Sequence, residues 1–105
     1  MIQTIKNMLG LGPKADLKSL VQNGAVIVDV RTKSEYQSGH IKGSVNIPLQ
    51  ELSGQLGKLK KDQVIITCCA SGMRSASARG VLRSKGFEQV HNGGGWQNLH
   101  YKISR

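Results

Sequence analysis

One cysteine near the middle of the chain has neighbours that suit covalent sulfur chemistry. Residues 69–75 read Cys-Ala-Ser-Gly-Met-Arg-Ser and follow the apolar run Val-Ile-Ile at 64–66. A helix is expected to begin near Arg74, so Cys69 would lie where backbone N–H groups converge and the positive end of the helix dipole points. Both features favour the thiolate, which is the nucleophilic form of cysteine. We therefore take Cys69 as the candidate catalytic residue.

The residues that follow Cys69 are small, which lets the loop curl tightly. Gly72, with Ala70 and Ser71 before it, allows backbone N–H groups to point inward, as they do in an anion-binding nest. Arg74 adds a permanent positive charge. Together these groups should lower the pKa of the Cys69 thiol from its ordinary value of about 8.5. The same loop suits a small oxyanion.

The chain has two cysteines, Cys68 and Cys69, and they are adjacent. Neighbouring Cα atoms lie about 3.8 Å apart, whereas an ordinary disulfide spans about 4.4–6.8 Å. A structural disulfide is therefore not expected, and neither a CxxC redox pair nor a multi-cysteine zinc site is present. We expect Cys68 to be a buried strand residue, with a role as a resolving thiol as the alternative.

Strands and helices are expected to alternate along the chain. The predicted strands are 25–30, 44–47, 64–68 and 87–91. The predicted helices are 14–22, 32–38 with a capping box from Thr32 to Glu35, 50–59, 74–85, and one that begins at Trp96. The glycine triplet 93–95 is expected to be a flexible turn.

This alternation predicts an α/β fold with a parallel sheet covered by helices on both faces. Sites in such sheets gather at the carboxyl ends of the strands, where Cys69, Asp29 and Arg31 are expected to lie. The 105 residues are enough for one domain with its own core. We expect residues 1–13 to be an N-terminal extension with a short helix, and residues 14–105 to form the single domain.

Charge and composition limit the kinds of partner that we expect for this protein. The formal net charge is +9, which suits small anions or an acidic partner protein. Aromatic residues make up 4% of the chain, so stacking platforms are scarce and no nucleic-acid partner is expected. No run approaches the roughly 20 apolar residues of a membrane span. Residues 1–10 lack a signal-peptide pattern, which favours the cytoplasm, with the periplasm as the alternative if a signal peptide has been removed.

Three motifs, in order, resemble those of a single-domain rhodanese, a sulfurtransferase. They are residues 28–36, residues 39–48 and the loop 69–75, and the tail at 86–88 and 93–96 also fits. The resemblance covers roughly residues 14–100. It implies a rhodanese-like α/β fold whose parallel central sheet has about five strands, with helices on both faces. A monomer is the default expectation for the oligomeric state.

The resemblance also implies a mechanism through a cysteine persulfide. Cys69 would take the sulfane sulfur of a donor such as thiosulfate and pass it to cyanide or a thiol, with ping-pong kinetics and with no metal or organic cofactor. Arg31 and Arg74 would attract the anionic donor. The backbone N–H groups that would hold the persulfide are those of Ala70, Ser71, Gly72, Met73 and Arg74.

Several residues near the motifs have a structural interpretation beside the functional one. Arg74 could form an ion pair with Asp29 or Glu35, and we expect both carboxylates to belong to the framework. Arg31 is either a framework residue or a charge at the pocket rim. His40 lies between two glycines in the linking loop and is expected to make a structural hydrogen bond rather than to act in catalysis.

Two other functions remain open at this stage. A cysteine phosphatase or arsenate reductase would use Cys-x5-Arg, a spacing that holds from Cys68 to Arg74 but not from Cys69. The other alternative is a rhodanese-like module for protein interaction or sulfur relay. The physiological donor and acceptor are not encoded in any motif that we recognise.

Overall fold

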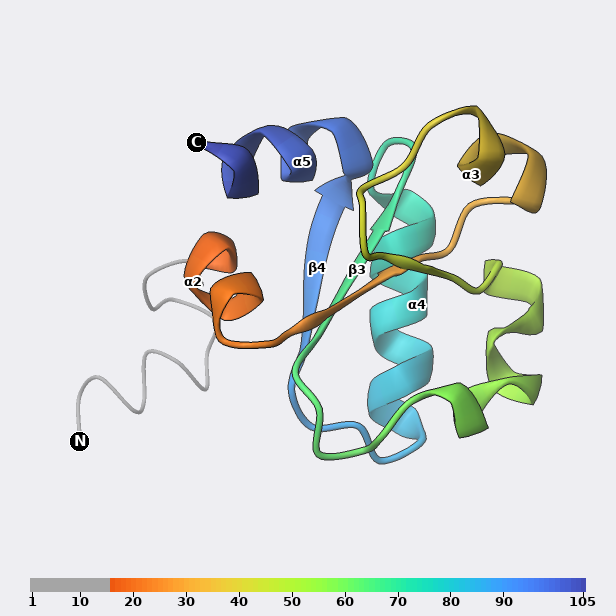
Figure 1. Ribbon diagram of the computed structural model, residues 1–105. Coiled ribbons are helices and arrows are strands. Elements are labelled where there is room, and N and C mark those ends of the chain that lie inside the picture. The colour runs from red at the N-terminus through yellow and green to blue at the C-terminus, as the bar shows by residue number, and fades with distance from the viewer. Residues whose placement is uncertain (1–15) are drawn as a thin grey trace.

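The computed structural model describes residues 16–105, and a parallel sheet runs through their centre (Figure 1). Its strands are β1 (Val26–Asp29), β2 (Val45–Asn46), β3 (Ile65–Cys69) and β4 (Val90–Gly95). They lie in the order β2-β1-β3-β4, and every neighbouring pair is parallel. The predicted α/β class is confirmed. The described residues contain four strands rather than about five.

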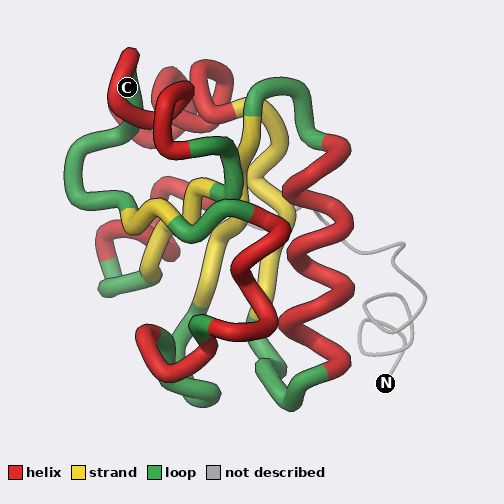
Figure 2. Tube along the Cα trace, turned by 90° about the vertical axis from the view of Figure 1, so that its right-hand side faces the viewer, coloured by secondary structure: helices red, strands yellow, loops and turns green. Residues whose placement is uncertain are grey.

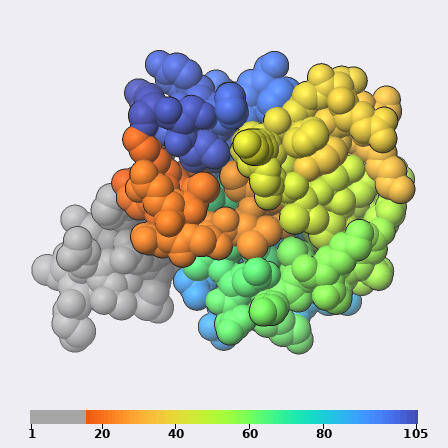
Figure 3. Space-filling model, viewed as in Figure 1, coloured from red at the N-terminus to blue at the C-terminus, as the bar shows by residue number. Residues whose placement is uncertain are grey.

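Helices cover both faces of the sheet, as Figure 2 shows from the side. One face carries α4 (Met73–Ser84) and the 3₁₀ helices η1 (Leu49–Gly54) and η2 (Leu56–Lys58). The other face carries α2 (Leu17–Gln22) and α5 (Trp96–Ser104), which lie side by side (Figure 3). The remaining helix, α3 (Lys33–Ser38), follows the carboxyl end of β1.

Two hydrophobic cores result, one on each side of the sheet. Side chains alternate along a strand, so Ile65 packs in the core beneath α4 while Ile66 packs in the core beneath α5. Each is fully buried. The same alternation puts Cys69 in the first core and Cys68 in the second. Both cysteines are free thiols, and they lie on opposite faces of the sheet.

Side chains cap the starts of α3 and α2, and the first of these caps is the predicted one. The Thr32 side chain accepts from the Glu35 amide, and the Glu35 carboxylate accepts from the Thr32 amide, so the predicted capping box is confirmed. Asp16 caps α2 through the Ser19 amide. The predicted extension, residues 1–13, lies outside the described residues. None of the described helices is long and apolar enough to cross a membrane.

Two of the predicted elements are wrong. The helix predicted at 50–59 is replaced by η1 and η2, because Gly54 and Gly57 weaken an α-helix there. The strand predicted at 87–91 is β4, which includes the glycine triplet that was predicted to be a flexible turn. A Cβ at Gly93 would lie 2.7 Å from the Thr67 oxygen, so only glycine lets β4 approach β3 this closely.

Candidate active site

Cys69 ends β3, and a short loop leads from it into α4. Gly72 caps that helix with φ 110° and ψ −17°, a left-handed conformation that favours glycine. Cys69 has no exposed surface, whereas Ala70 and Ser71 are exposed and Met73 is 81% exposed. The thiol therefore lies beneath its own loop.

Backbone N–H groups converge on the sulfur of Cys69. The Gly72 amide donates to Sγ at 3.0 Å, and the Ser75 amide donates at 3.3 Å. Burial acts to raise the pKa of Cys69, but the amides of Ser75 and Gly72, followed by those of Ser71 and Arg74, lower it, and the pKa lies below its ordinary value. Of the predicted amides, those of Ser71, Gly72 and Arg74 act on the thiol, and the Ser75 amide adds to them, so the loop favours the thiolate.

Cys68 has the opposite environment. Burial, followed by the charge of Asp29, raises the pKa of its thiol to about 12. Its side chain packs with Ile27, Ile66 and Leu99 on the face away from the loop. This placement favours the buried strand role for Cys68 over that of a resolving thiol. It also argues against the phosphatase alternative, which needs the Cys68 thiol inside the loop.

A second layer of hydrogen bonds holds Ser75 in place behind the sulfur. The Thr67 hydroxyl donates to the Ser75 carbonyl oxygen at 2.9 Å. The Ser75 hydroxyl contacts the Gly72 carbonyl oxygen at 3.1 Å and also the Asn92 side-chain oxygen, which accepts from the Gly94 amide at 2.9 Å. β4 thus supports the loop around Cys69.

Sequence reasoning missed this supporting layer. Ser75 is part of the loop motif, but its contribution is a backbone N–H, which only the loop geometry reveals. Asn92 lies 17 residues further along the chain, and no local pattern connects it to Ser75.

Arg74 is anchored to α3. Its Nη1 and Nη2 atoms donate to the two carboxylate oxygens of Glu35 at 2.8 and 3.0 Å. This bidentate pair, with the Thr32 amide second, lowers the pKa of Glu35 to about 2. The ion pair expected with one of two carboxylates is therefore with Glu35. The pairing fixes the Arg74 charge beside the loop, where its side chain stays 36% exposed.

Arg31 has a framework position. It is 4% exposed, and its Nε and Nη2 atoms donate to the Asp29 carboxylate at 2.9 and 2.7 Å. Its Nη2 also donates to the Gly39 oxygen at 2.7 Å, its Nη1 donates to the Glu35 main-chain oxygen at 3.2 Å, and its guanidinium lies 4.7 Å from the Trp96 ring centre. All three side-chain nitrogens are occupied within the protein, which favours the framework interpretation over the expected attraction of the donor.

His40 also makes structural contacts. Its ring stacks on Tyr36 with centroids 3.7 Å apart, and its Nδ1 lies 2.7 Å from the Tyr36 main-chain oxygen. Asp29 is fully buried in its pair with Arg31. Within residues 16–105, no group of three His, Cys, Asp or Glu side chains is placed to hold a metal ion.

Known proteins resemble this chain over most of its length. The family model described as "Rhodanese-like domain" matches residues 13–101. The uncharacterized protein YqhL of Bacillus subtilis is 34% identical over 75% of this chain and 64% of its own length. The thiosulfate sulfurtransferase PspE of Escherichia coli is 31% identical over 69% of this chain and 71% of its own. The solved human single-domain sulfurtransferase TSTD1 superposes with a TM-score of 0.70 at 27% identity, covering 85% of this chain and 91% of its own.

Proposed function

The chain belongs to the rhodanese-like domain family, and from this premise we propose that it is a sulfurtransferase that carries sulfur as a persulfide on Cys69. The observation that carries the proposal is the convergence of the Gly72 and Ser75 amides on Sγ. A relative named thiosulfate sulfurtransferase supports the same class of reaction.

In the first half-reaction, the Cys69 thiolate attacks the outer sulfur of an anionic donor such as thiosulfate. A bond forms between Sγ and that sulfur, the S–S bond of the donor breaks, and sulfite leaves with the bonding electron pair. The persulfide keeps one negative charge on its outer sulfur. The amides of the loop then stabilise this charge as they stabilise the thiolate.

In the second half-reaction, an acceptor nucleophile attacks the outer sulfur. When cyanide attacks, the product is thiocyanate, and when a thiolate attacks, the product is a new persulfide. In both cases the bond between Sγ and the outer sulfur breaks, and its electron pair returns to Sγ, which is again a thiolate. Because each half-reaction regenerates the other enzyme form, the kinetics should be ping-pong. No proton has to be stored on a side chain in either step.

Both charge and burial affect how an anionic donor reaches Cys69. Arg74 is held by Glu35 and stays 36% exposed, so it supplies a fixed positive charge beside the loop for an arriving anion. Cys69 has no exposed surface, so the donor reaches Sγ only when the residues around the thiol move.

Thiocyanate formation from thiosulfate and cyanide tests the proposal. We expect turnover in the wild type with parallel lines in double-reciprocal plots, and no turnover in a folded Cys69→Ala variant. A Cys68→Ala variant is the matched control and should keep turnover. A folded, reduced wild type that transfers sulfur neither from thiosulfate nor from an organic persulfide would favour the interaction-module alternative.

A further inference from the structure

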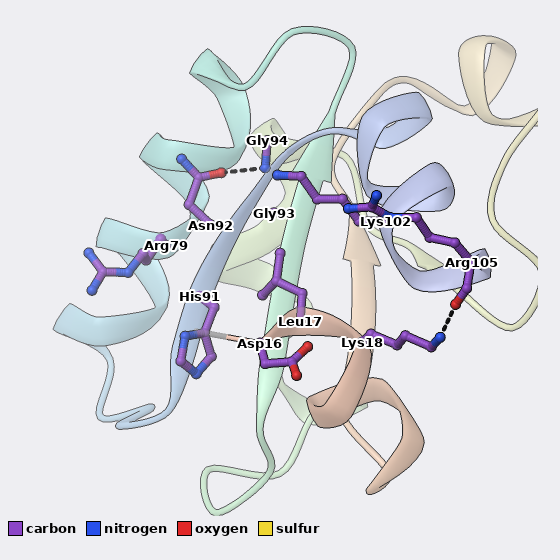
Figure 4. Close-up of a pocket in the computed structure, with 10 residues that line it drawn as sticks. All are labelled: Asp16, Leu17, Lys18, Arg79, His91, Asn92, Gly93, Gly94, Lys102 and Arg105. Carbon is purple, nitrogen blue, oxygen red and sulfur yellow. Dashed lines mark hydrogen bonds between the residues drawn. The ribbon is translucent and has the colours of Figure 1, made fainter. Parts of the chain in front are cut away.

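A recess lies along one edge of the sheet, and it includes none of residues 69–74. β4 is an edge strand, and a pocket of about 630 Å³ opens beside it between α4 on one side and α2 and α5 on the other (Figure 4). Its walls are formed by Asp16, Leu17, Lys18, Arg79, His91, Asn92, Gly93, Gly94, Lys102 and Arg105. Pockets of this size accommodate small molecules.

Positive charge dominates the lining. Four of the ten residues are lysine or arginine, and the one acidic residue, Asp16, already accepts from the Ser19 amide and hydroxyl as the cap of α2. These hydrogen bonds favour the charged form of Asp16, so the pocket holds one carboxylate against four cationic side chains, and its net charge still attracts an anion.

The cations come from both walls. Arg79 of α4 donates from Nε to the Val90 main-chain oxygen at 2.8 Å, which fixes its guanidinium against the edge strand. Within residues 16–105 its Nη atoms make no hydrogen bond or ion pair. Lys102 comes from α5 on the opposite side of β4 (Figure 4). Lys18 donates to the main-chain oxygen of Arg105. A ligand with two separated negative groups could therefore contact both walls.

The pocket is a neighbour of the thiol site but does not include it. None of residues 69–74 lines it. The two are separated by β4, where Gly94 packs near Gly72 and Asn92 contacts Ser75. The lining has no thiol or hydroxyl side chain, and its cationic groups suit the binding of an anion.

We propose that this pocket binds a small molecule that carries two or more phosphate groups. Guanidinium and ammonium groups are the side chains that phosphate oxygens prefer. An added Cβ at Gly94 would meet nothing within 4 Å, so this glycine leaves part of the pocket floor without a side chain and a ligand can approach the strand backbone there. The proposal is independent of the sulfur chemistry. A free polyphosphate and a nucleoside diphosphate share this chemistry, and the two probes below distinguish them.

The test is a titration followed by amide and imidazole NMR signals. Inorganic tripolyphosphate and ADP are added separately at about 0.15 M salt, where screening acts over about 8 Å and weakens distant surface attraction. We expect saturable shifts, with one site per chain, centred on His91, Asn92 and Gly94. Tighter binding of tripolyphosphate would indicate a free phosphate chain, and tighter binding of ADP a nucleotide.

Matched charge variants locate the site. Lys102→Gln removes a cation from the pocket, and we expect the dissociation constant to rise by about three- to tenfold, as for the loss of one exposed charged contact. Lys60→Gln removes the same charge from an exposed turn outside the lining, and it should leave affinity unchanged.

Three results would overturn the proposal. The first is the absence of saturation, or shifts spread over the whole surface. The second is an equal loss of affinity in the two variants, which would indicate attraction by net charge alone. The third is saturation of the pocket by an acidic peptide with no response to either phosphate probe.

Discussion

Replacing Gly72 with alanine should disturb both the loop and the ionisation of Cys69. Gly72 has φ 110°, and a side chain in the left-handed region costs about 1–2 kcal/mol. Space is not the problem, because the new Cβ would lie 3.5 Å from Gly94 Cα, an ordinary contact. The strain is relieved if the peptide before residue 72 rotates, and that rotation moves its N–H away from Sγ, where it now donates at 3.0 Å.

The size of the effect follows from that one hydrogen bond. A hydrogen bond to a charged group contributes about 1.5–3 kcal/mol, and about 1.4 kcal/mol corresponds to a factor of ten. We therefore expect the pKa of Cys69 to rise in the Gly72→Ala variant. The thiolate fraction near neutral pH should fall by about tenfold, and the free energy of unfolding should fall by about 1–2 kcal/mol.

The assay is the rate of iodoacetamide alkylation as a function of pH, with peptide mapping to assign the modified cysteine. Cys68, with its buried thiol and its pKa of about 12, should not compete. A looser loop would expose the thiol and raise the maximal alkylation rate that is reached at high pH. A less stabilised thiolate would instead move the midpoint of the rate–pH curve to higher pH, so the two effects can be told apart. Urea unfolding measures the loss of stability.

Gly80→Ala is the matched control. Gly80 lies within α4, has no positive φ, and has nothing within 4 Å of an added Cβ. This variant should keep the midpoint and should gain up to about 1 kcal/mol of stability, because alanine is a better helix former than glycine. If Gly72→Ala kept the wild-type midpoint and stability, the Gly72 amide would not be what stabilises the thiolate.

Three further predictions concern packing, charge and the second thiol. Gly93→Ala should lose about 1–3 kcal/mol of stability in urea unfolding, because its Cβ would overlap the β3 backbone, and a wild-type stability would contradict that close approach. Glu35→Gln should cost about 1 kcal/mol at pH 7, discounted because the pair is partly exposed. Because the pKa of Glu35 is lowered to about 2, this stability is fully present above the ordinary carboxyl pKa and is lost as pH falls toward 2. If the variant and the wild type still differed in the free energy of unfolding by the full amount at pH 2, the ion pair with Arg74 would be refuted. Cys68→Ala should lose about 1 kcal/mol through the cavity left in the core yet keep persulfide formation on intact-protein mass, and loss of the persulfide in a folded variant would restore a role for Cys68.

Local signals in the sequence were enough for the elements that hold the thiol. The capping box from Thr32 to Glu35 acts over three residues, and the β-branched runs around Ile27 and Ile65 have the composition of buried strands. The position of Cys69 between a strand and a helix is equally local. The converging amides followed from the small residues of its loop.

Contacts between distant segments were not accessible in the same way. The sequence left two carboxylates open as partners of Arg74, and only the packing of α3 beside the loop selects Glu35, 39 residues away. The Asn92 contact with Ser75 depends on the pairing of β3 with β4. The role of Gly93 depends on the same pairing, because a glycine triplet in isolation has the pattern of a turn.

Arg31 illustrates a different limit. Its position after β1 suited both a donor site and a framework, since an arginine at a strand end is compatible with either. In the structure, the framework role is favoured because Arg31 is buried and donates to oxygens of Asp29, Glu35 and Gly39. A sequence motif records that a guanidinium is present, but not which way it points.

The most direct test of the central claim is the intact mass of the protein after incubation with thiosulfate, measured before and after cyanide is added. The wild type should gain the mass of one sulfur atom and lose it to cyanide, and a folded Cys69→Ser variant should gain none. If the folded, reduced wild type gained no sulfur, or if Cys69→Ser gained as much, the assignment of the persulfide to Cys69 would be contradicted.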